Sequence, residues 1–123
     1  MYKLLLLDVD GTLLKQKGDS VSPVVRQAVA KIRDRVHASL CTGRTHQDAM
    51  QVIDELGIAS SYHVIESGAK VLNPQGEEEN VKSISTEGIE WILAEAGATP
   101  AAYGFCTSGI WLDSLAKIGS GLV

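Results

Sequence analysis

Two acidic residues stand directly after a short apolar run, and their types and spacing suit chemistry on phosphate. Asp8 and Asp10 follow Leu4–Leu7 and lie two residues apart. Two carboxylates at such close range are unfavourable unless a cation lies between them or one carboxyl keeps its proton. Mg²⁺ suits the first arrangement, because it accepts a few carboxylate oxygens together with waters and a substrate phosphate. A shared proton suits the second, because such a carboxyl acts as general acid and base.

Small and hydroxyl-bearing residues accompany these carboxylates. Gly11 lets the backbone turn sharply and brings amide N–H groups near an anion. Thr42 offers a hydroxyl donor, and Gly43 permits another close backbone approach. Together they predict a pocket of the size of a phosphate group.

Both groups of residues are expected at the ends of parallel strands. The apolar run from Lys3 to Val9 predicts a central strand buried on both faces, and the run from Val36 to Cys41 predicts a second strand that stops at Thr42. A third short strand is expected from Tyr62 to Ile65. Ligands of open α/β sheets bind beyond the carboxyl ends of the strands, so the two polar strand ends converge on one place.

Two helices are expected between these strands. Ser22 before Pro23 is an N-cap followed by proline at the first helical position. The second helix is expected to end at Gly57. The β-α-β-α-β order over the first 65 residues indicates a doubly wound α/β sheet. The apolar residues at helical spacing are Val24, Val25, Ala28, Val29 and Ile32 in the first helix, and Ala49, Met50, Ile53 and Leu56 in the second.

The rest of the chain predicts a smaller set of elements. Lys70–Leu72 and Val81–Ile84 flank the turn-forming residues 73–76, which favours an antiparallel hairpin. A third helix is expected to end at Gly97, and the stretch from Tyr103 to Leu112 predicts one further strand. The residues on one face of that third helix are Ile89, Ile92, Leu93 and Ala96.

Composition and charge exclude some classes of protein. The net charge of −4 comes without a basic cluster, which argues against a nucleic-acid partner. Leu4–Leu7 is too short for a signal-peptide core or a membrane span, so no membrane partner and a cytoplasmic location are expected. Several residues are predicted to have structural rather than functional roles: Cys41 and Cys106 as buried reduced thiols, His37, His46 and His63 as surface or strand-edge residues, Trp91 and Trp111 in core packing, and 77–79 as a solvated turn.

At two segments the sequence resembles a known family. The run 5–14, LLLDVDGTLL, resembles the first signature of the haloacid dehalogenase-like phosphatase superfamily, and the run 39–44, SLCTGR, resembles the second. The later Ser67-Gly68-Ala69 and the helix beginning near Ser22 are similar to the branch that hydrolyses sugar phosphates, although Ser67 stands where that branch has asparagine. The resemblance implies a partial doubly wound (Rossmann-like) parallel sheet in residues 1–76 and the beginning of an α/β cap in 77–123.

The resemblance also implies roles for these residues. Asp8 is expected to be the nucleophile that forms an aspartyl-phosphate, and Asp10 to protonate the leaving alcohol and then activate water. Mg²⁺ is the implied cofactor, with Asp8 and Asp10 as its ligands. Arg44 either touches substrate or is a solvated charge at a helix start. The implied substrate is a small phosphorylated metabolite such as a sugar phosphate, and the residues placed around its phosphate are Gly11, Thr12, Thr42, Gly43 and Arg44.

One part of the family pattern has no match. The family has a lysine and then an acidic segment after the cap, whereas here the late residues of these types are only Asp113 and Lys117, in the wrong order. The sequence is therefore expected to be truncated, the alternative being that another copy of the chain supplies the missing surface. Besides a phosphohydrolase, this leaves open a catalytically incompetent Mg²⁺- and phosphate-binding fragment or oligomerising domain, or a phosphosugar mutase. An unfinished sheet also predicts a homo-oligomer.

Overall fold

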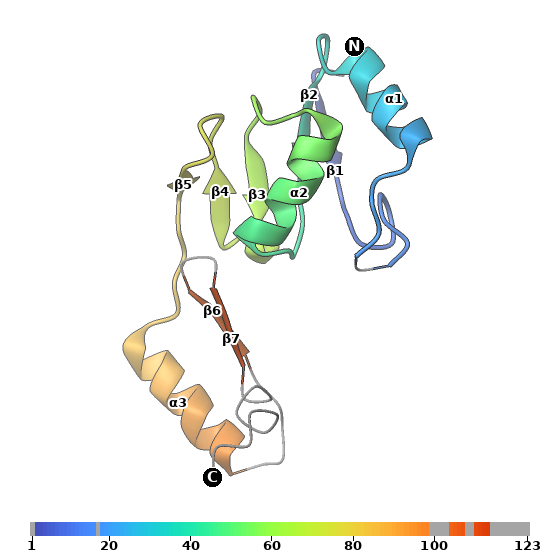
Figure 1. The fold of residues 1–123 in the computed structure, drawn as a ribbon. Coiled ribbons are helices and arrows are strands. Elements are labelled where there is room, and N and C mark those ends of the chain that lie inside the picture. Colours follow the sequence, from blue (N-terminus) through green and yellow to red (C-terminus); the bar gives the residue numbers. More distant parts are fainter. Residues whose placement is uncertain (1, 17, 99–103, 108–109, 114–123) are drawn as a thin grey trace. The chain divides into compact units, whose positions relative to one another are not determined.

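The computed structural model describes residues 2–16, 18–98, 104–107 and 110–113 (Figure 1). Lys117 and Tyr103, which enter the sequence-based expectations, lie outside these residues. The chain divides into two compact units, Met1–Lys82 and Ser83–Val123. The assignment of residues 77–123 to the beginning of a cap stays a prediction.

The first unit is built on short paired strands. β1 (Leu4–Leu7) pairs in parallel with β2 (His37–Leu40), with Leu7 opposite Leu40. Beyond β2, an isolated parallel bridge joins Cys41 to Val64 in β3 (His63–Ile65). β3 then pairs antiparallel with β4 (Lys70–Leu72), and β4 with β5 (Glu78–Glu79). β2 therefore lies between β1 and β3, and the parallel part of the predicted α/β sheet is confirmed.

Helices connect the parallel strands as the sequence predicts. α1 (Pro23–Ile32) begins after Ser22, whose hydroxyl accepts a hydrogen bond of 3.3 Å from the Val25 N–H. α2 (His46–Leu56) begins after Thr45, which caps it in the same way. Gly57 ends α2 in the left-handed conformation, with φ of 62°. The predicted N-cap of α1 and C-cap of α2 are confirmed.

The described residues of the first unit form a hydrophobic core. α2 contributes its inward face, which carries four buried residues, whereas α1 contributes only Val29. Val24, one of the apolar residues at helical spacing in α1, is 76% exposed and lies outside the buried face of that helix. The buried core residues are Val9, Leu14, Val21, Val29, Ala38, Leu40, Ala49, Val52, Ile53, Leu56, Ile58, Ile65 and Leu72.

The expectation of a central first strand buried on both faces is wrong. In the described residues β1 pairs only with β2, and Leu4 and Leu6 are each 55% exposed. An apolar run shows that a strand is suited to burial, but which elements cover it depends on distant parts of the chain. Within the described part of the first unit, the face of β1 that carries Leu4 and Leu6 stays open.

The hairpin forms three residues earlier than predicted. Its second strand is β5 at Glu78–Glu79, and residues 81–84 form no strand. Asn73 explains the shift. Its side-chain Oδ1 accepts from the Gln75 and Glu77 N–H groups at 2.9 Å each, and its Nδ2 donates to Glu77 at 2.9 Å. This tightens the turn, so pairing begins directly after it.

His63 is buried, which contradicts its prediction as a surface or strand-edge residue. Its Nδ1 accepts a 3.0 Å hydrogen bond from the Leu40 N–H, and its Nε2 lies 3.1 Å from the Ile58 carbonyl. Because Nδ1 is an acceptor, Nε2 carries the proton and donates, and the ring is neutral. Burial lowers the pKa of His63, against a smaller opposite effect of the Ile58 carbonyl. The ring thus joins β2 to β3 in its neutral form.

The second unit contains α3 (Thr86–Gly97), β6 (Gly104–Thr107) and β7 (Ile110–Asp113). The predicted end of the helix at Gly97 is confirmed. The single strand expected from Tyr103 to Leu112 is wrong, because β6 and β7 are two strands paired antiparallel. α3 buries none of its residues, and Trp91 is 66% exposed rather than packed in a core.

Cys41 is free and exposed, so its prediction as a buried thiol is wrong. Among the described residues, no helix is long and apolar enough to cross a membrane.

Candidate functional site

The ends of β1 and β2 lie beside each other, as the sequence predicts. The Cys41 N–H donates to the Leu7 carbonyl at 2.9 Å, which places Asp8 next to the end of β2. One residue later, the Thr42 N–H donates to the Val64 carbonyl in β3 at 3.0 Å. The carboxyl ends of three parallel-paired segments therefore meet where Asp8 and Thr42 follow their strands.

A tight turn follows Asp8. The Val9 carbonyl accepts hydrogen bonds from the N–H groups of Thr12, Leu13 and Leu14 at 2.9 to 3.2 Å. Gly11 has a φ of 82°, a conformation that favours glycine, so the expected sharp turn is present. The Thr12 hydroxyl donates to Asp8 Oδ2 at 3.0 Å. Thr12 thus orients the Asp8 carboxylate while leaving that side chain exposed.

Asp10 forms a two-point ion pair with Arg44. Arg44 Nε donates to Asp10 Oδ2 at 2.9 Å, and Arg44 Nη2 donates to Asp10 Oδ1 at 2.8 Å. The Arg44 side chain is only 10% exposed, against 54% for Asp10. The hydrogen bond to Asp10 raises the pKa of Arg44, outweighing its partial burial. Arg44 is therefore not a solvated charge, because it clamps a residue of the other strand end.

Thr42 and Gly43 complete the second strand end. Thr42 is 5% exposed, and its Oγ1 accepts a 3.2 Å hydrogen bond from the Arg44 N–H. Since that oxygen already accepts, its hydroxyl proton is available to donate to another oxygen. Gly43 lies against Ser67: a Cβ added at Gly43 would lie 3.1 Å from Ser67 Oγ.

The residues present give a partial fit to Mg²⁺. The described residues contain no group of three or more His, Cys, Asp or Glu side chains that could hold a metal ion. Asp8 accepts one hydrogen bond from Thr12, and a carboxylate has about four acceptor positions. Mg²⁺ commonly binds through one or two carboxylates together with waters and substrate phosphate. The Asp8 carboxylate and the Asp10 backbone carbonyl suit that kind of site.

A corner after β3 belongs to the site, and its Glu66–Lys70 ion pair was missed in the sequence. The Glu66 N–H donates to the Arg44 carbonyl at 2.9 Å, and the Ser67 N–H donates to the Thr42 carbonyl at 3.1 Å. Lys70, only 7% exposed, lies 3.2 Å from Glu66 and 3.1 Å from Glu78. A lysine four residues after a glutamate was the available signal for this ion pair.

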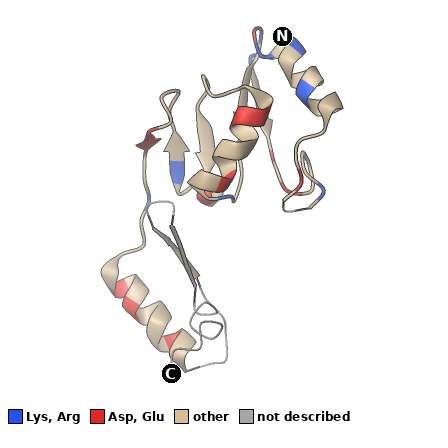
Figure 2. Ribbon diagram, viewed as in Figure 1, with Lys and Arg blue, Asp and Glu red and all other residues tan. Residues whose placement is uncertain are grey.

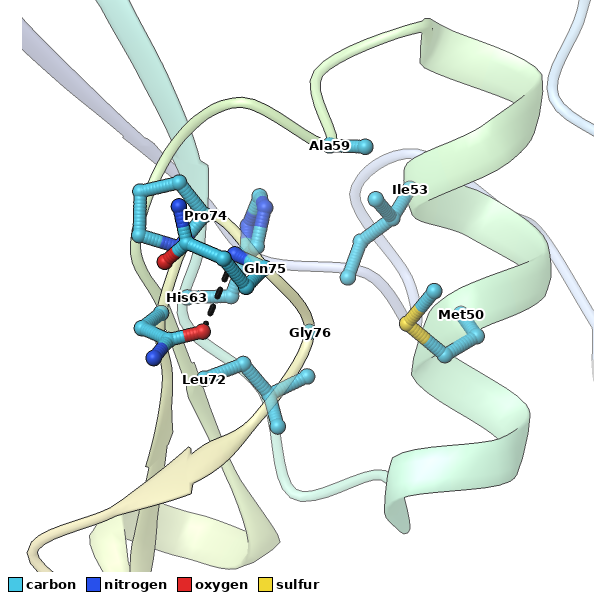
Figure 3. Close-up of a pocket in the computed structure, with 9 residues that line it drawn as sticks. Met50, Ile53, Ala59, His63, Leu72, Pro74, Gln75 and Gly76 are labelled. Atoms are coloured by element: carbon cyan, nitrogen blue, oxygen red, sulfur yellow. Dashed lines mark hydrogen bonds between the residues drawn. The ribbon is translucent and has the colours of Figure 1, made fainter.

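Figure 3 shows a pocket that lies apart from the two polar strand ends. It measures about 100 Å³ and lies between α2 and the turn at 73–76, with Met50 and Ile53 pointing toward Gln75 and Gly76. None of the predicted site residues lines it. Both ring nitrogens of His63, which also lines it, are already hydrogen-bonded.

The fold and the strand ends agree with the comparison to known proteins. Residues 5–113 match the model of the haloacid dehalogenase-like hydrolase family. Because the match covers most of the sequence, the chain belongs to this family. The resemblance of runs 5–14 and 39–44 is confirmed.

Three known proteins show how far the similarity extends. The phosphatase YwpJ of Bacillus subtilis is 36% identical over 75 residues, which cover 60% of this chain and 26% of that protein. The structure of BT1666 from Bacteroides thetaiotaomicron, a phosphatase of this superfamily, matches all of this chain and 48% of its own, with a TM-score of 0.78 and 24% identity. The subclass IIB sugar phosphatase BT4131 matches 89% of this chain and 42% of its own, with a TM-score of 0.72 and 18% identity. The chain thus spans between a quarter and a half of their lengths.

Proposed function

We propose that this chain carries the nucleophile and acid–base half of a Mg²⁺-dependent phosphohydrolase. The observation that supports it most directly is the Asp10–Arg44 ion pair, which ties the two polar strand ends together beside Asp8. Membership of the family and the similarity to YwpJ, which is named a phosphatase, support the same reaction class.

Asp8 is the proposed nucleophile. One of its carboxylate oxygens attacks phosphorus, the bond from phosphorus to the ester oxygen breaks, and Asp10 gives a proton to the departing alkoxide. In the second step water attacks the aspartyl-phosphate, Asp10 takes the proton, and inorganic phosphate leaves while the Asp8 carboxylate is regenerated. The Thr12 hydrogen bond keeps Asp8 in one orientation for both steps.

Arg44 sets the state of Asp10 between these steps. A guanidinium held against both oxygens stabilises the ionised carboxylate, which is the form that accepts a proton from water. Giving a proton to the leaving alkoxide requires this pair to loosen when substrate binds and the Asp10 carboxylate to take a proton from bulk water. The proton that Asp10 accepts from the attacking water in the second step restores that protonated form. The phosphate itself is expected to lie among Gly11, Thr12, Thr42 and Gly43, with the Thr42 hydroxyl donating to one of its oxygens.

Mg²⁺ would be held by the Asp8 carboxylate and the Asp10 backbone carbonyl, and when bound it would neutralise charge on the phosphoryl group. The proposed substrate is a small phosphorylated metabolite such as a sugar phosphate. The fold similarity to the sugar phosphatase BT4131 supports this substrate class.

A second candidate is an oligomerising, phosphate-binding domain without turnover of its own. The observation that favours it is the open face of β1, where Leu4 and Leu6 are each 55% exposed on a strand that the described residues pair on one side only. Under this proposal the protein sediments as a dimer or larger species. Leu6→Lys shifts it toward monomer without lowering its melting temperature, whereas unchanged sedimentation contradicts the proposal.

Phosphate release separates the two candidates. A panel of sugar phosphates and an aryl phosphate is assayed with Mg²⁺ and with chelator, for the wild type, for Asp8→Asn and for the matched control Asp54→Asn, an exposed aspartate on α2. Hydrolysis that needs Mg²⁺, is lost in Asp8→Asn by a factor of at least about 10³ and survives in Asp54→Asn supports the hydrolase. Folded protein without turnover supports the second candidate.

A further inference from the structure

Two consecutive non-glycine residues adopt a left-handed backbone directly after β3. Glu66 has a φ of 50°, and Ser67 has φ and ψ of 56° and 33°. For residues with a Cβ this conformation is unfavourable, because the Cβ comes too close to the following carbonyl oxygen. Such a cost persists only where the surrounding structure fixes the backbone, and residues of this kind cluster at functional sites. Contacts with neighbouring residues must therefore hold the backbone of Glu66 and Ser67 in this conformation.

The corner folds back onto the loop Thr42–Gly43–Arg44. Hydrogen bonds from the backbone N–H groups of Glu66 and Ser67 hold the carbonyls of Arg44 and Thr42, at 2.9 and 3.1 Å. Between these two bonds the Ser67 hydroxyl lies over Gly43, in the space that any side chain at position 43 would need. Glycine at 43 therefore makes room for Ser67.

Buried charges keep the corner in place. Lys70 Nζ lies 3.2 Å from Glu66 Oε1 and 3.1 Å from Glu78 Oε1, and His46 at the start of α2 lies 2.9 Å from the same Glu78 oxygen. Burial alone would lower the pKa of Lys70, but its hydrogen bonds with Glu78 and Glu66 raise it overall, so the lysine stays charged. β4 and β5 are thereby connected to the corner, and through Glu66 to Arg44.

We propose that Ser67 is a positioning residue of the site. Its hydroxyl packs against Gly43 and so fixes the loop Thr42–Gly43–Arg44. The Glu66–Lys70 ion pair holds Ser67 in its left-handed conformation. Through the Arg44 carbonyl this corner also sets where the guanidinium meets Asp10. The inference rests on the proposed function only in that the loop is taken to bind phosphate.

A double-mutant cycle tests the packing without any ligand. Gly43→Ala is compared in the wild type and in Ser67→Gly, by thermal melting monitored by circular dichroism. We expect Gly43→Ala to lower the melting temperature by about 4 °C or more in the wild type, and by less than half as much in Ser67→Gly, where the added methyl group has room. Equal losses in both backgrounds would overturn the proposal.

Binding of inorganic phosphate tests the positioning role. The wild type, Ser67→Gly, Ser67→Asn and the matched control Ser60→Gly, an exposed serine in a turn, are titrated with phosphate while amide NMR shifts of Thr42 and Gly43 are followed. We expect Ser67→Gly to weaken binding about tenfold, a loss of about 1.4 kcal/mol. Ser67→Asn keeps a polar group and tolerates the left-handed backbone, so it should bind within about threefold of the wild type.

The outcomes separate the two proposals. Unchanged binding in Ser67→Gly, or loss in Ser60→Gly equal to that in Ser67→Gly, overturns the positioning role. A wild type that binds no phosphate overturns the proposed function of the loop, and the double-mutant cycle then decides alone whether Ser67 holds it.

Discussion

α2 and α3 have the same kind of N-cap, but their side chains differ in how far they are buried. Each has a hydroxyl N-cap, Thr45 or Ser85, that accepts a hydrogen bond from the third helical N–H, and each has an acidic residue in its first turn. α2 buries four side chains in the core, whereas α3 buries none. α3 also carries glutamates and no lysine or arginine (Figure 2).

The difference separates interactions between residues close in the sequence from interactions between residues far apart in it. Caps and helix propensity involve residues within one turn of each other, so both helices form. Burial requires partners from elsewhere in the chain, and among the residues whose burial the structure describes, the core runs from Val9 to Leu72 in the first unit. Forming a helix and stabilising a fold are therefore separable in this molecule.

The largest expected contrast comes from one substitution made in both helices. Ile53 on α2 is 1% exposed, and Ile89 on α3 is 36% exposed. Ile53→Ala removes buried methyl groups and leaves a cavity, so we expect it to lower the free energy of unfolding by about 2–5 kcal/mol. Ile89→Ala should cost clearly less than Ile53→Ala, because Ile89 keeps about a third of its surface in water and its truncation opens no enclosed cavity. Urea denaturation followed by circular dichroism measures both, and equal losses would contradict the division into a packed and an unpacked helix.

A pH effect of intermediate size should separate the two units. Burial holds the pKa of His63 below its ordinary value of 6.5 in the folded state. Near that pH the unfolded chain therefore binds more protons than the folded protein. The free energy of unfolding that neutral His63 contributes is fully present above about pH 6.5. It declines as the pH falls below this value, by up to about 1.4 kcal/mol per pH unit. His63→Gln should flatten this decline, and His37→Gln, at an exposed position, should not.

The second unit contains no histidine, so the stability of α3 should not depend on pH between pH 5 and 7. Amide exchange of α2 and α3 between pH 5 and 7 measures the two helices separately. A decline of the same slope in both helices, or one that survives in His63→Gln, would show that another group titrates.

The smallest expected effect should be the same in both helices. Thr45→Ala and Ser85→Ala each remove the oxygen that accepts the third helical N–H, at 3.4 and 3.1 Å. We expect each to destabilise its own helix by about 1 kcal/mol. Amide exchange in the first turn of α2 and of α3 measures the two losses. A much larger loss in α2 would mean that the cap of that helix also supports the core.

The parts of the fold that could be predicted from the sequence are those that depend on neighbouring residues. Ser22 and Gly57 act on the helix beside them, so their positions suffice to predict the start of α1 and the end of α2. The burial of β1 could not be predicted, because what covers Leu4 and Leu6 depends on elements far from them. β5 was misplaced because the Asn73 side chain, rather than the apolar residues at 81 and 84, sets the pairing.

The site could be predicted in part. Asp8, Asp10 and Thr42 follow apolar strands, and parallel pairing of β1 with β2 brings their ends together. The Arg44 clamp on Asp10 and the corner at Ser67 depend on side-chain directions and on backbone conformation, which spacing alone does not give. The burial of His63 had a usable signal, since it shares a strand face with buried Ile65 two residues later.

The exposed thiol of Cys41 gives the site a chemical handle. It stands between β2 and the loop that begins at Thr42, and its backbone is fixed by the Leu7 carbonyl. A maleimide dye attached there, in a Cys106→Ser background, sits next to the loop on a rigid support. Its emission then turns occupancy of the loop into an optical signal, which allows ligands to be screened before any turnover is found.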